Sequence, residues 1–186
     1  MDGQTEARRY QDHAENAESP AMTSTTTTTA SRGGARTLRV GDLESVIAID
    51  RAYTGQSRRR FFEKRFAAAN AHPDDYVLVG VDEGKSLAGY AFAHLLHGEF
   101  GREQASATLD AVGVAPDSRD HGIGQALMQG LVEVLRGKSV RSLQSQADWT
   151  NHNLLRFFEA AKFELAPRLV LQRSAVDLLA EEVDEV

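Results

Sequence analysis

The chain has 186 residues, a hydrophobic content of 41% and a formal net charge of -6. This length supports one core of ordinary size, so we expect a single domain with tails. The absence of cysteine excludes disulfides, thiolate metal sites and cysteine nucleophiles, and it is typical of an intracellular protein. No run approaches the ~20 apolar residues of a membrane span, and the N-terminus lacks the order of a secretion signal, so we expect a cytoplasmic protein with no membrane partner.

The acidity is concentrated at the C-terminal end. Residues 177–186 carry five acids and no base, whereas residues 37–176 carry 17 acids and 17 bases. The central part of the chain is therefore near neutral and lacks the broad positive surface of a nucleic-acid binder. We expect no nucleic-acid partner.

Composition divides the chain into three parts. Residues 1–36 are polar and rich in threonine, and they are expected to be disordered because they have too few apolar groups to form a core. Residues 37–173 show the hydrophobic patterns of a folded α/β domain. Residues 174–186 form an acidic C-terminal tail.

Strand and helix patterns follow one another along residues 37–173. A strand is expected at 37–40, a first helix from residue 43 up to Gly55, and a second helix at 58–70. Two apolar runs at 76–81 and 87–94 predict a hairpin. The remaining expected elements are a strand at 105–114, a helix at 122–135, a strand at 140–147, a helix at 154–161, and two short strands within 163–173 separated near Pro167.

A glycine-containing turn precedes the helix expected at 122–135. Gly122 and Gly124 leave the backbone N–H groups of the helix start open to an anion, which the helix dipole also favours. Arg119 adds a charged donor that suits a diphosphate. A tight turn or close helix packing would also explain the two glycines. A Rossmann loop is disfavoured because Leu127 stands where its third glycine would be, and no Walker sequence occurs.

The residues around this turn form an extended motif. A strand, a proline and an RxxGxG sequence follow one another, in the residues Val112, Gly113, Val114, Ala115, Pro116, Arg119, Gly122 and Gly124. This motif resembles the acetyl-CoA signature of the GNAT superfamily of N-acetyltransferases, and the order of elements over residues 37–173 is also similar. The resemblance implies an α/β GNAT fold, with a mixed, mostly antiparallel sheet of about seven strands flanked by four helices. It also implies a bulged strand at 105–114 that separates from the next strand around acyl-CoA.

The same resemblance implies the cosubstrate, acetyl-CoA, and its binding residues, with no metal. The backbone of Val112 to Val114, Gly113 included, would pair with the pantetheine arm and face the thioester oxygen. The pyrophosphate would be held by the loop Arg119, Asp120, His121, Gly122, Ile123 and Gly124. Asn151 and Phe158 occupy further positions that contact the coenzyme in the family.

Two residues depart from the family pattern. Phe158 stands where a tyrosine normally protonates the departing thiolate, and Lys162 stands where a glycine is usual. A phenyl ring cannot donate a proton. The thiol of coenzyme A has an intrinsic pKa near that of cysteine, about 8.5, so water can serve as the proton source at neutral pH. Asn151 also has a second interpretation, as the N-cap of the helix that follows it.

Two carboxylates are candidates for the base that deprotonates an attacking amine. Asp110 lies two residues before Val112 and would share its face of the strand unless a bulge intervenes. Pairing with an arginine would also explain Asp110. Glu99 lies in the loop between two strands, where a solvated loop acid is the favoured alternative explanation. For acceptor binding, the candidates are Tyr53, Arg58 and Trp149. Arg58 is also explained as part of a solvated helix face, and Trp149 as a packing residue.

The sequence therefore predicts direct transfer of an acetyl group from acetyl-CoA to a primary amine, which could be a protein lysine, an N-terminal amine or a small molecule. Phe158 keeps open a non-catalytic acyl-CoA-binding module on a degenerate GNAT fold. A third alternative is an interaction protein that works through Arg58 to Arg60 and the acidic tail. A homodimer is compatible with the sequence.

Overall fold

A computed structural model describes residues 34–98 and 104–174. The two tails up to residue 33 and from residue 175, together with the candidate base Glu99, lie outside the described residues. The helices are α1 (Leu43–Thr54), α2 (Arg59–Ala71), α3 (Ile123–Gly137) and α4 (His152–Ala160). The strands are β1 (Arg36–Thr37), β2 (Tyr76–Glu83), β3 (Ser86–Leu96), β4 (Ser106–Val114) and β5 (Ser142–Gln144). Each helix was expected close to its observed position.

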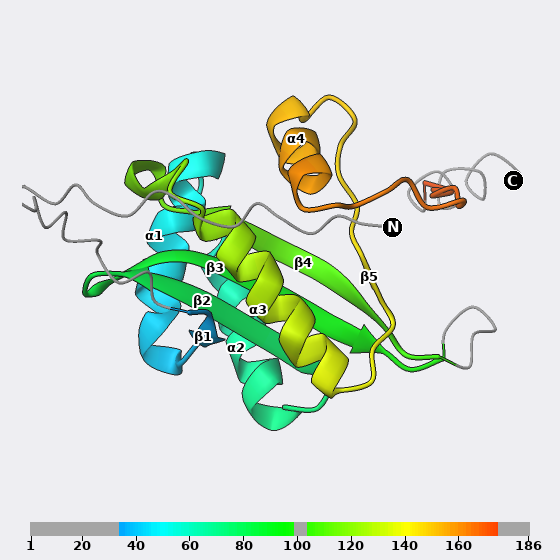
Figure 1. Cartoon of the computed structure of the whole chain (residues 1–186), viewed down its shortest axis with the longest axis horizontal. Coiled ribbons are helices and arrows are strands. Elements are labelled where there is room, and N and C mark those ends of the chain that lie inside the picture. Colours follow the sequence, from blue (N-terminus) through cyan, green and yellow to red (C-terminus); the bar gives the residue numbers. More distant parts are fainter. Residues whose placement is uncertain (1–33, 99–103, 175–186) are drawn as a thin grey trace, which may run out of the picture.

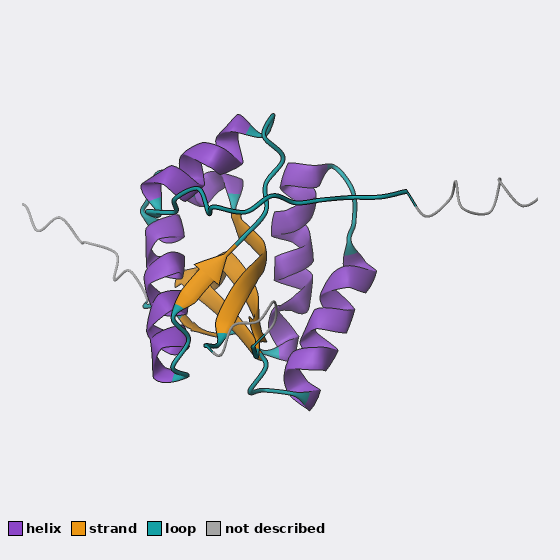
Figure 2. Cartoon of the chain, turned by 90° about the vertical axis from the view of Figure 1, so that its right-hand side faces the viewer, coloured by secondary structure: helices purple, strands orange, loops and turns teal. Residues whose placement is uncertain are grey.

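The strands form one five-stranded sheet in the order β1-β2-β3-β4-β5. The first three pairings are antiparallel, and β5 alone lies parallel to its neighbour β4. The sheet is therefore mixed and mostly antiparallel, as expected. Helices cover both of its faces, and α3 crosses one face while α1 and α2 lie behind the other (Figures 1 and 2).

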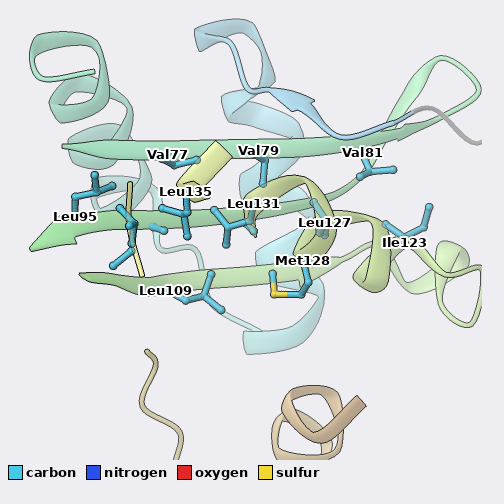
Figure 3. Close-up of a cluster of buried hydrophobic side chains, with 14 of the residues drawn as sticks. Val77, Val79, Val81, Leu95, Leu109, Ile123, Leu127, Met128, Leu131 and Leu135 are labelled. Carbon is cyan, nitrogen blue, oxygen red and sulfur yellow. The ribbon is translucent and has the colours of Figure 1, made fainter. Parts of the chain in front are cut away.

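The core under α3 is aliphatic. Leu127 and Leu131 of this helix are fully buried, and they pack against β2, β3 and β4 (Figure 3). Apolar residues recur in α3 at helical spacing, so one stripe of the helix is removed from water. This stripe fixes α3 on the sheet and thereby places its N-terminus next to the end of β4.

The core under α1 and α2 contains a cluster of aromatic rings among aliphatic residues. Phe62 of α2 is fully buried, and its ring makes edge contacts with the rings of Tyr90 and Phe92 on β3. Phe66 adds a further edge contact with Phe92. Edge-to-face pairs of this kind stabilise beyond the area that they bury. They fix α2 over the strand next to β4.

Two expected strands are shorter in the structure. The strand expected at 37–40 is reduced to Arg36–Thr37, because the Asp42 carboxylate accepts the N–H of Arg39 at 2.7 Å and closes a 3-10 turn over Val40–Asp42. The strand expected at 140–147 is reduced to Ser142–Gln144, because the Ser145 hydroxyl, at 3.1 Å, donates to the Leu109 carbonyl where a backbone N–H would otherwise pair.

The expectation of two strands within 163–173 was wrong, so the described sheet has five strands instead of about seven. Residues 163–174 form no strand, and the side chains of Leu165, Leu169 and Leu171 are each at least 88% exposed. The three-residue β5 offers little edge for pairing, and Pro167 has no N–H to donate. Across the described part of the chain, no helix is both long and apolar enough to cross a membrane.

Candidate functional site

The outer edge of β4 is open along half of its length. β5 pairs with β4 only from Ser106 to Thr108, and the two strands then separate (Figure 1). The N–H of Ala115 donates to Ala88 of β3 at 2.7 Å. Backbone groups alternate in direction along a strand, so those of Val114 and Val112 point to the open side. The predicted separation of these strands is confirmed, and it leaves a row of donors and acceptors next to α3.

The loop that follows β4 delivers the chain to the start of α3. Two left-handed residues on either side of His121 shape it, with φ of 62° at Asp120 and 77° at Gly122. Gly122 is the N-cap of α3 and has no side chain to accept a hydrogen bond. The N–H groups of the first turn therefore keep free donor capacity at the positive end of a 15-residue helix. This arrangement suits an anion such as the coenzyme pyrophosphate.

Close packing also requires the second glycine of the motif. A Cβ atom on Gly124 would lie 2.9 Å from the Phe157 ring of α4. Of the two alternatives to an anion site, a tight turn thus explains Gly122 and close helix packing explains Gly124. Both are compatible with an anion site, since a residue without a side chain also leaves the backbone open.

Arg119 is held in place by Tyr53, in the last turn of α1. The Tyr53 hydroxyl donates to the Val114 carbonyl at 2.6 Å and accepts from Arg119 Nε at 3.1 Å. The Arg119 guanidinium also lies over the Tyr53 ring, 4.5 Å from its centre. Tyr53, expected at the acceptor, is therefore found with two residues expected at the coenzyme.

Glu83, at the end of β2, braces the same loop. Its carboxylate accepts the Ser118 hydroxyl at 2.6 Å and lies 3.0 Å from His121 Nδ1. His121 is thus turned toward Glu83 in the present structure. In the sequence, Glu83 lies between the two apolar runs of the predicted hairpin, and no local pattern connects a hairpin to a loop 35 residues away.

A β-bulge places Asp110 at the middle of β4. The pairing with β3 shifts between Phe92 and Ala93, so Asp110 is an extra residue without a partner. Leu109 and Val112 consequently belong to the core under α3, with two residues between them instead of one. The predicted bulge is confirmed, and it puts Asp110 on the α2 face, opposite to Val112.

Two basic side chains surround Asp110 on that face. Its Oδ1 lies 2.8 Å from His94 Nδ1, and its Oδ2 lies 3.1 Å from Arg65 Nη2 of α2. The Asp110 side chain is only 9% exposed. Its Oδ2 has no well-directed hydrogen bond within the described chain, nor has Arg65 Nε. The expected pairing with an arginine is present, and the Oδ2 atom retains capacity to accept a further hydrogen bond.

Arg65 is a site residue that was not predicted, although its position in the sequence carries a signal. Arg65 lies three residues after Phe62 and four before Ala69, on the apolar face of the helix. A charged residue on an apolar stripe requires a partner. The sequence could not show that the partner is Asp110, because only the bulge turns Asp110 toward α2.

Arg58 is turned into the fold. Its guanidinium forms a two-point ion pair with Asp50, whose side chain is 4% exposed, and the Tyr90 hydroxyl donates to the same carboxylate at 3.0 Å. Burial raises the pKa of Tyr90, so its hydroxyl stays protonated as a donor. Hydrogen bonding to Asp50 raises the pKa of Arg58. This network joins α1, α2 and β3 and carries no side chain into the open edge.

The residues around α4 are more exposed. Asn151 Oδ1 accepts the N–H of Leu154 at 3.2 Å, so the N-cap interpretation of Asn151 is confirmed. Phe158 packs against the rings of Phe157 and Phe163, while Trp149 is 84% exposed. Lys162, at the position of the family glycine, has a positive φ of 64°.

Comparisons with known proteins agree with this site. Residues 43–163 match the model of the acetyltransferase (GNAT) family. A search of curated proteins found no match. A transcriptional regulator from Bacillus halodurans C-125 superposes with a TM-score of 0.65 and 19% identity, over 75% of this chain and 97% of that one.

Two enzymes are also similar in structure. AAC(6')-Iy, in complex with a bisubstrate analogue, has a TM-score of 0.62 and 18% identity, over 75% of this chain and 96% of that one. Glucosamine-6-phosphate N-acetyltransferase from Arabidopsis thaliana has a TM-score of 0.59 and 15% identity, over the same shares of the two chains. At these identities the structural matches show the fold alone. Since the family match spans well over half of the sequence, the chain belongs to the acetyltransferase (GNAT) family and is an acyl-CoA-dependent N-acyltransferase.

Proposed function

We propose that the protein transfers an acetyl group from acetyl-CoA to a primary amine by direct attack. The observation that carries this proposal is the continuity of the open β4 edge with the N-terminus of α3. Val112 and Val114 offer backbone groups to a pantetheine chain along this edge. Arg119 and the first-turn N–H groups of α3 then meet the pyrophosphate at its end. When bound, acetyl-CoA supplies the thioester that the amine attacks.

Asp110 is the proposed proton acceptor for the attacking amine. It lies at the bulge two residues before Val112, and its Oδ2 is free of a well-directed hydrogen bond within the described chain. Because its side chain is mostly buried, we propose that a water molecule carries the proton from the amine to Asp110. Backbone N–H groups at the open edge would stabilise the oxyanion that forms on the carbonyl. The proposed reaction ends with a new amide bond and coenzyme A released as a thiolate, which water protonates.

The acceptor is expected to be a primary amine on a small molecule or on a protein. Thiol release from acetyl-CoA tests this with a lysine peptide, a peptide with a free α-amine and an amino sugar such as glucosamine. The amino sugar is included because similar structures come from enzymes that act on aminoglycosides and glucosamine 6-phosphate. At least one amine is expected to accelerate release above the hydrolytic background. Coenzyme binding without turnover on any amine would argue against transfer to amines of these three types.

Restoring a tyrosine at position 158 is expected to raise kcat. In the Phe158→Tyr variant, a hydroxyl would stand where the family places the group that protonates the leaving thiolate. The expected gain is modest, about two- to fivefold, because water already protonates a thiolate with a pKa near 8.5. Steady-state kinetics at saturating acetyl-CoA measure it. Phe163→Tyr is the matched control, since the Phe163 ring lies 4.8 Å from that of Phe158 and has no such role. A kcat for Phe158→Tyr at or below that of the native protein would contradict the prediction.

A further inference from the structure

We infer that Tyr53 is a positioning residue for the coenzyme, and that its side chain holds Arg119 in the orientation that receives the pyrophosphate. The inference rests on the proposed binding of acetyl-CoA along β4 and α3. It assigns Tyr53 to the coenzyme side of the site, whereas the sequence suggested the acceptor side.

Three contacts connect Tyr53 to the coenzyme site. The hydroxyl is anchored on the Val114 carbonyl at 2.6 Å, and the same oxygen accepts Arg119 Nε at 3.1 Å. The ring lies under the guanidinium at 4.5 Å, within the range of a cation–π interaction. Arg119 is thus fixed both through a hydrogen bond and through its flat face.

These contacts leave the binding end of Arg119 free. The Nη1 and Nη2 groups have no hydrogen-bond partner within the described chain, whereas Nε is occupied by Tyr53. The two terminal nitrogens of a guanidinium can donate in parallel to two oxygens of a phosphate. Tyr53 therefore occupies only the Nε donor of Arg119 and leaves both terminal nitrogens available to a phosphate.

Prior fixation increases affinity, because a free arginine side chain loses rotamer freedom when it binds a ligand. Stacking on Tyr53 removes part of that loss before the coenzyme arrives. Loss of the whole side chain in Tyr53→Ala is expected to raise the acetyl-CoA Kd about tenfold. Tyr53→Phe keeps the ring under the guanidinium and loses both hydrogen bonds, so about a threefold rise is expected.

Tyr53 lies where its replacement is not expected to destabilise the fold. It lies in the last turn of α1, which ends at Gly55 with a φ of 68°, and its side chain is half exposed. Its removal therefore takes little from the core. Thr54→Ala is the matched control, because Thr54 belongs to the same turn and binds only backbone carbonyls of Asp50 and Gln56 and the Gln56 N–H.

Calorimetric titration with acetyl-CoA, together with steady-state kinetics, measures the effect. The expected result is a higher Kd and KM for acetyl-CoA in Tyr53→Ala, with kcat and the KM for the amine within twofold of the native values. Thr54→Ala is expected to leave the Kd unchanged. In an Arg119→Ala background, Tyr53→Ala is expected to have no further effect, since its action passes through Arg119.

The outcomes separate this inference from the proposed function. A native protein that does not bind acetyl-CoA would overturn both. Normal binding by the native protein with an unchanged Kd in Tyr53→Ala would overturn the role of Tyr53 alone. A rise in the KM for the amine instead of the KM for acetyl-CoA would overturn the inference and indicate that Tyr53 binds the acceptor. An equal loss with and without Arg119 would show that Tyr53 acts independently of that arginine.

Discussion

Replacing Asp110 with asparagine is expected to lower kcat by about 100-fold or more, while the affinity for acetyl-CoA stays unchanged. General bases typically contribute 10²- to 10⁴-fold, and 100-fold corresponds to about 2.7 kcal/mol of activation free energy. Asparagine keeps the size of the side chain and one oxygen, which can accept from Arg65, while its amide NH2 group can donate to His94 Nδ1. It cannot accept a proton at neutral pH. Initial rates at saturating acetyl-CoA and amine measure the effect, and calorimetric titration measures the Kd.

A second histidine–aspartate pair supplies the control for this experiment. Asp75 lies 3.1 Å from His97 Nε2 at the open end of the β2–β3 hairpin, and both side chains are exposed and make no hydrogen bond or ion pair with Asp110 within the described chain. Asp75→Asn is expected to leave kcat unchanged. If Asp110→Asn retained a kcat within threefold of the native value, Asp110 would not be the base. A matching fall in thermal stability and acetyl-CoA affinity would instead identify the Asp110 contacts as structural.

Replacing Arg119 with alanine is expected to raise the acetyl-CoA Kd about 30-fold. Both terminal nitrogens of the Arg119 side chain have no hydrogen-bond partner within the described chain. Charge-assisted hydrogen bonds to a phosphate contribute about 1.5–3 kcal/mol each before water partly replaces them. A net loss of about 2 kcal/mol corresponds to that change in Kd. The difference between native and variant is expected to shrink at high salt, because salt screens exposed charges.

The control for Arg119 comes from the other end of the same helix. Arg136 lies in the last turn of α3, so its removal changes the net charge equally without affecting the anion site. Arg136→Ala is expected to bind acetyl-CoA like the native protein. Equal Kd values for Arg119→Ala and Arg136→Ala would show that the loop does not hold the pyrophosphate through Arg119.

Local chemistry made the loop and the helices predictable from sequence. A glycine just before a predicted helix is typical of a tight turn or of an anion site. In the structure Gly122 has a φ of 77°, a left-handed conformation that residues with a side chain adopt only at a cost in free energy. The apolar stripe of α3 follows from helical spacing alone. The bulge in β4 was predicted through the family resemblance, since nothing in the run Ala107 to Val114 marks Asp110 as an extra residue.

Strand lengths could not be predicted because pairing depends on distant residues. The pattern from Val140 to Ala147 is typical of a strand, yet Ser145 ends the pairing through a side-chain hydrogen bond to Leu109. The same limit applies to residues 163–173, whose apolar pattern finds no partner strand within the described chain. Propensity indicates which segments can pair, and tertiary contacts decide which do.

Contacts between side chains of different helices and strands also could not be predicted from the sequence. The contact of Arg65 with Asp110 joins residues 45 positions apart, and that of Tyr53 with Arg119 joins residues 66 positions apart. The spacing of residues within one helix or strand does not specify pairs that are so far apart in the sequence. These residues meet because α1 and α2 lie on the same face of the sheet. From there, Arg65 of α2 reaches Asp110 of β4, and Tyr53 of α1 reaches Arg119 in the loop after β4.

Unfolding of the native protein with and without acetyl-CoA tests most directly whether the coenzyme binds at the β4 edge and the α3 N-terminus. At a free concentration of about 100 times the Kd, the ligand is expected to raise the free energy of unfolding by about 2.7 kcal/mol. Arg119→Ala, titrated over the same concentrations, is expected to need about 30 times more ligand for the same increase. No stabilisation of the native protein by acetyl-CoA, or equal stabilisation of the native protein and Arg119→Ala, would contradict the account.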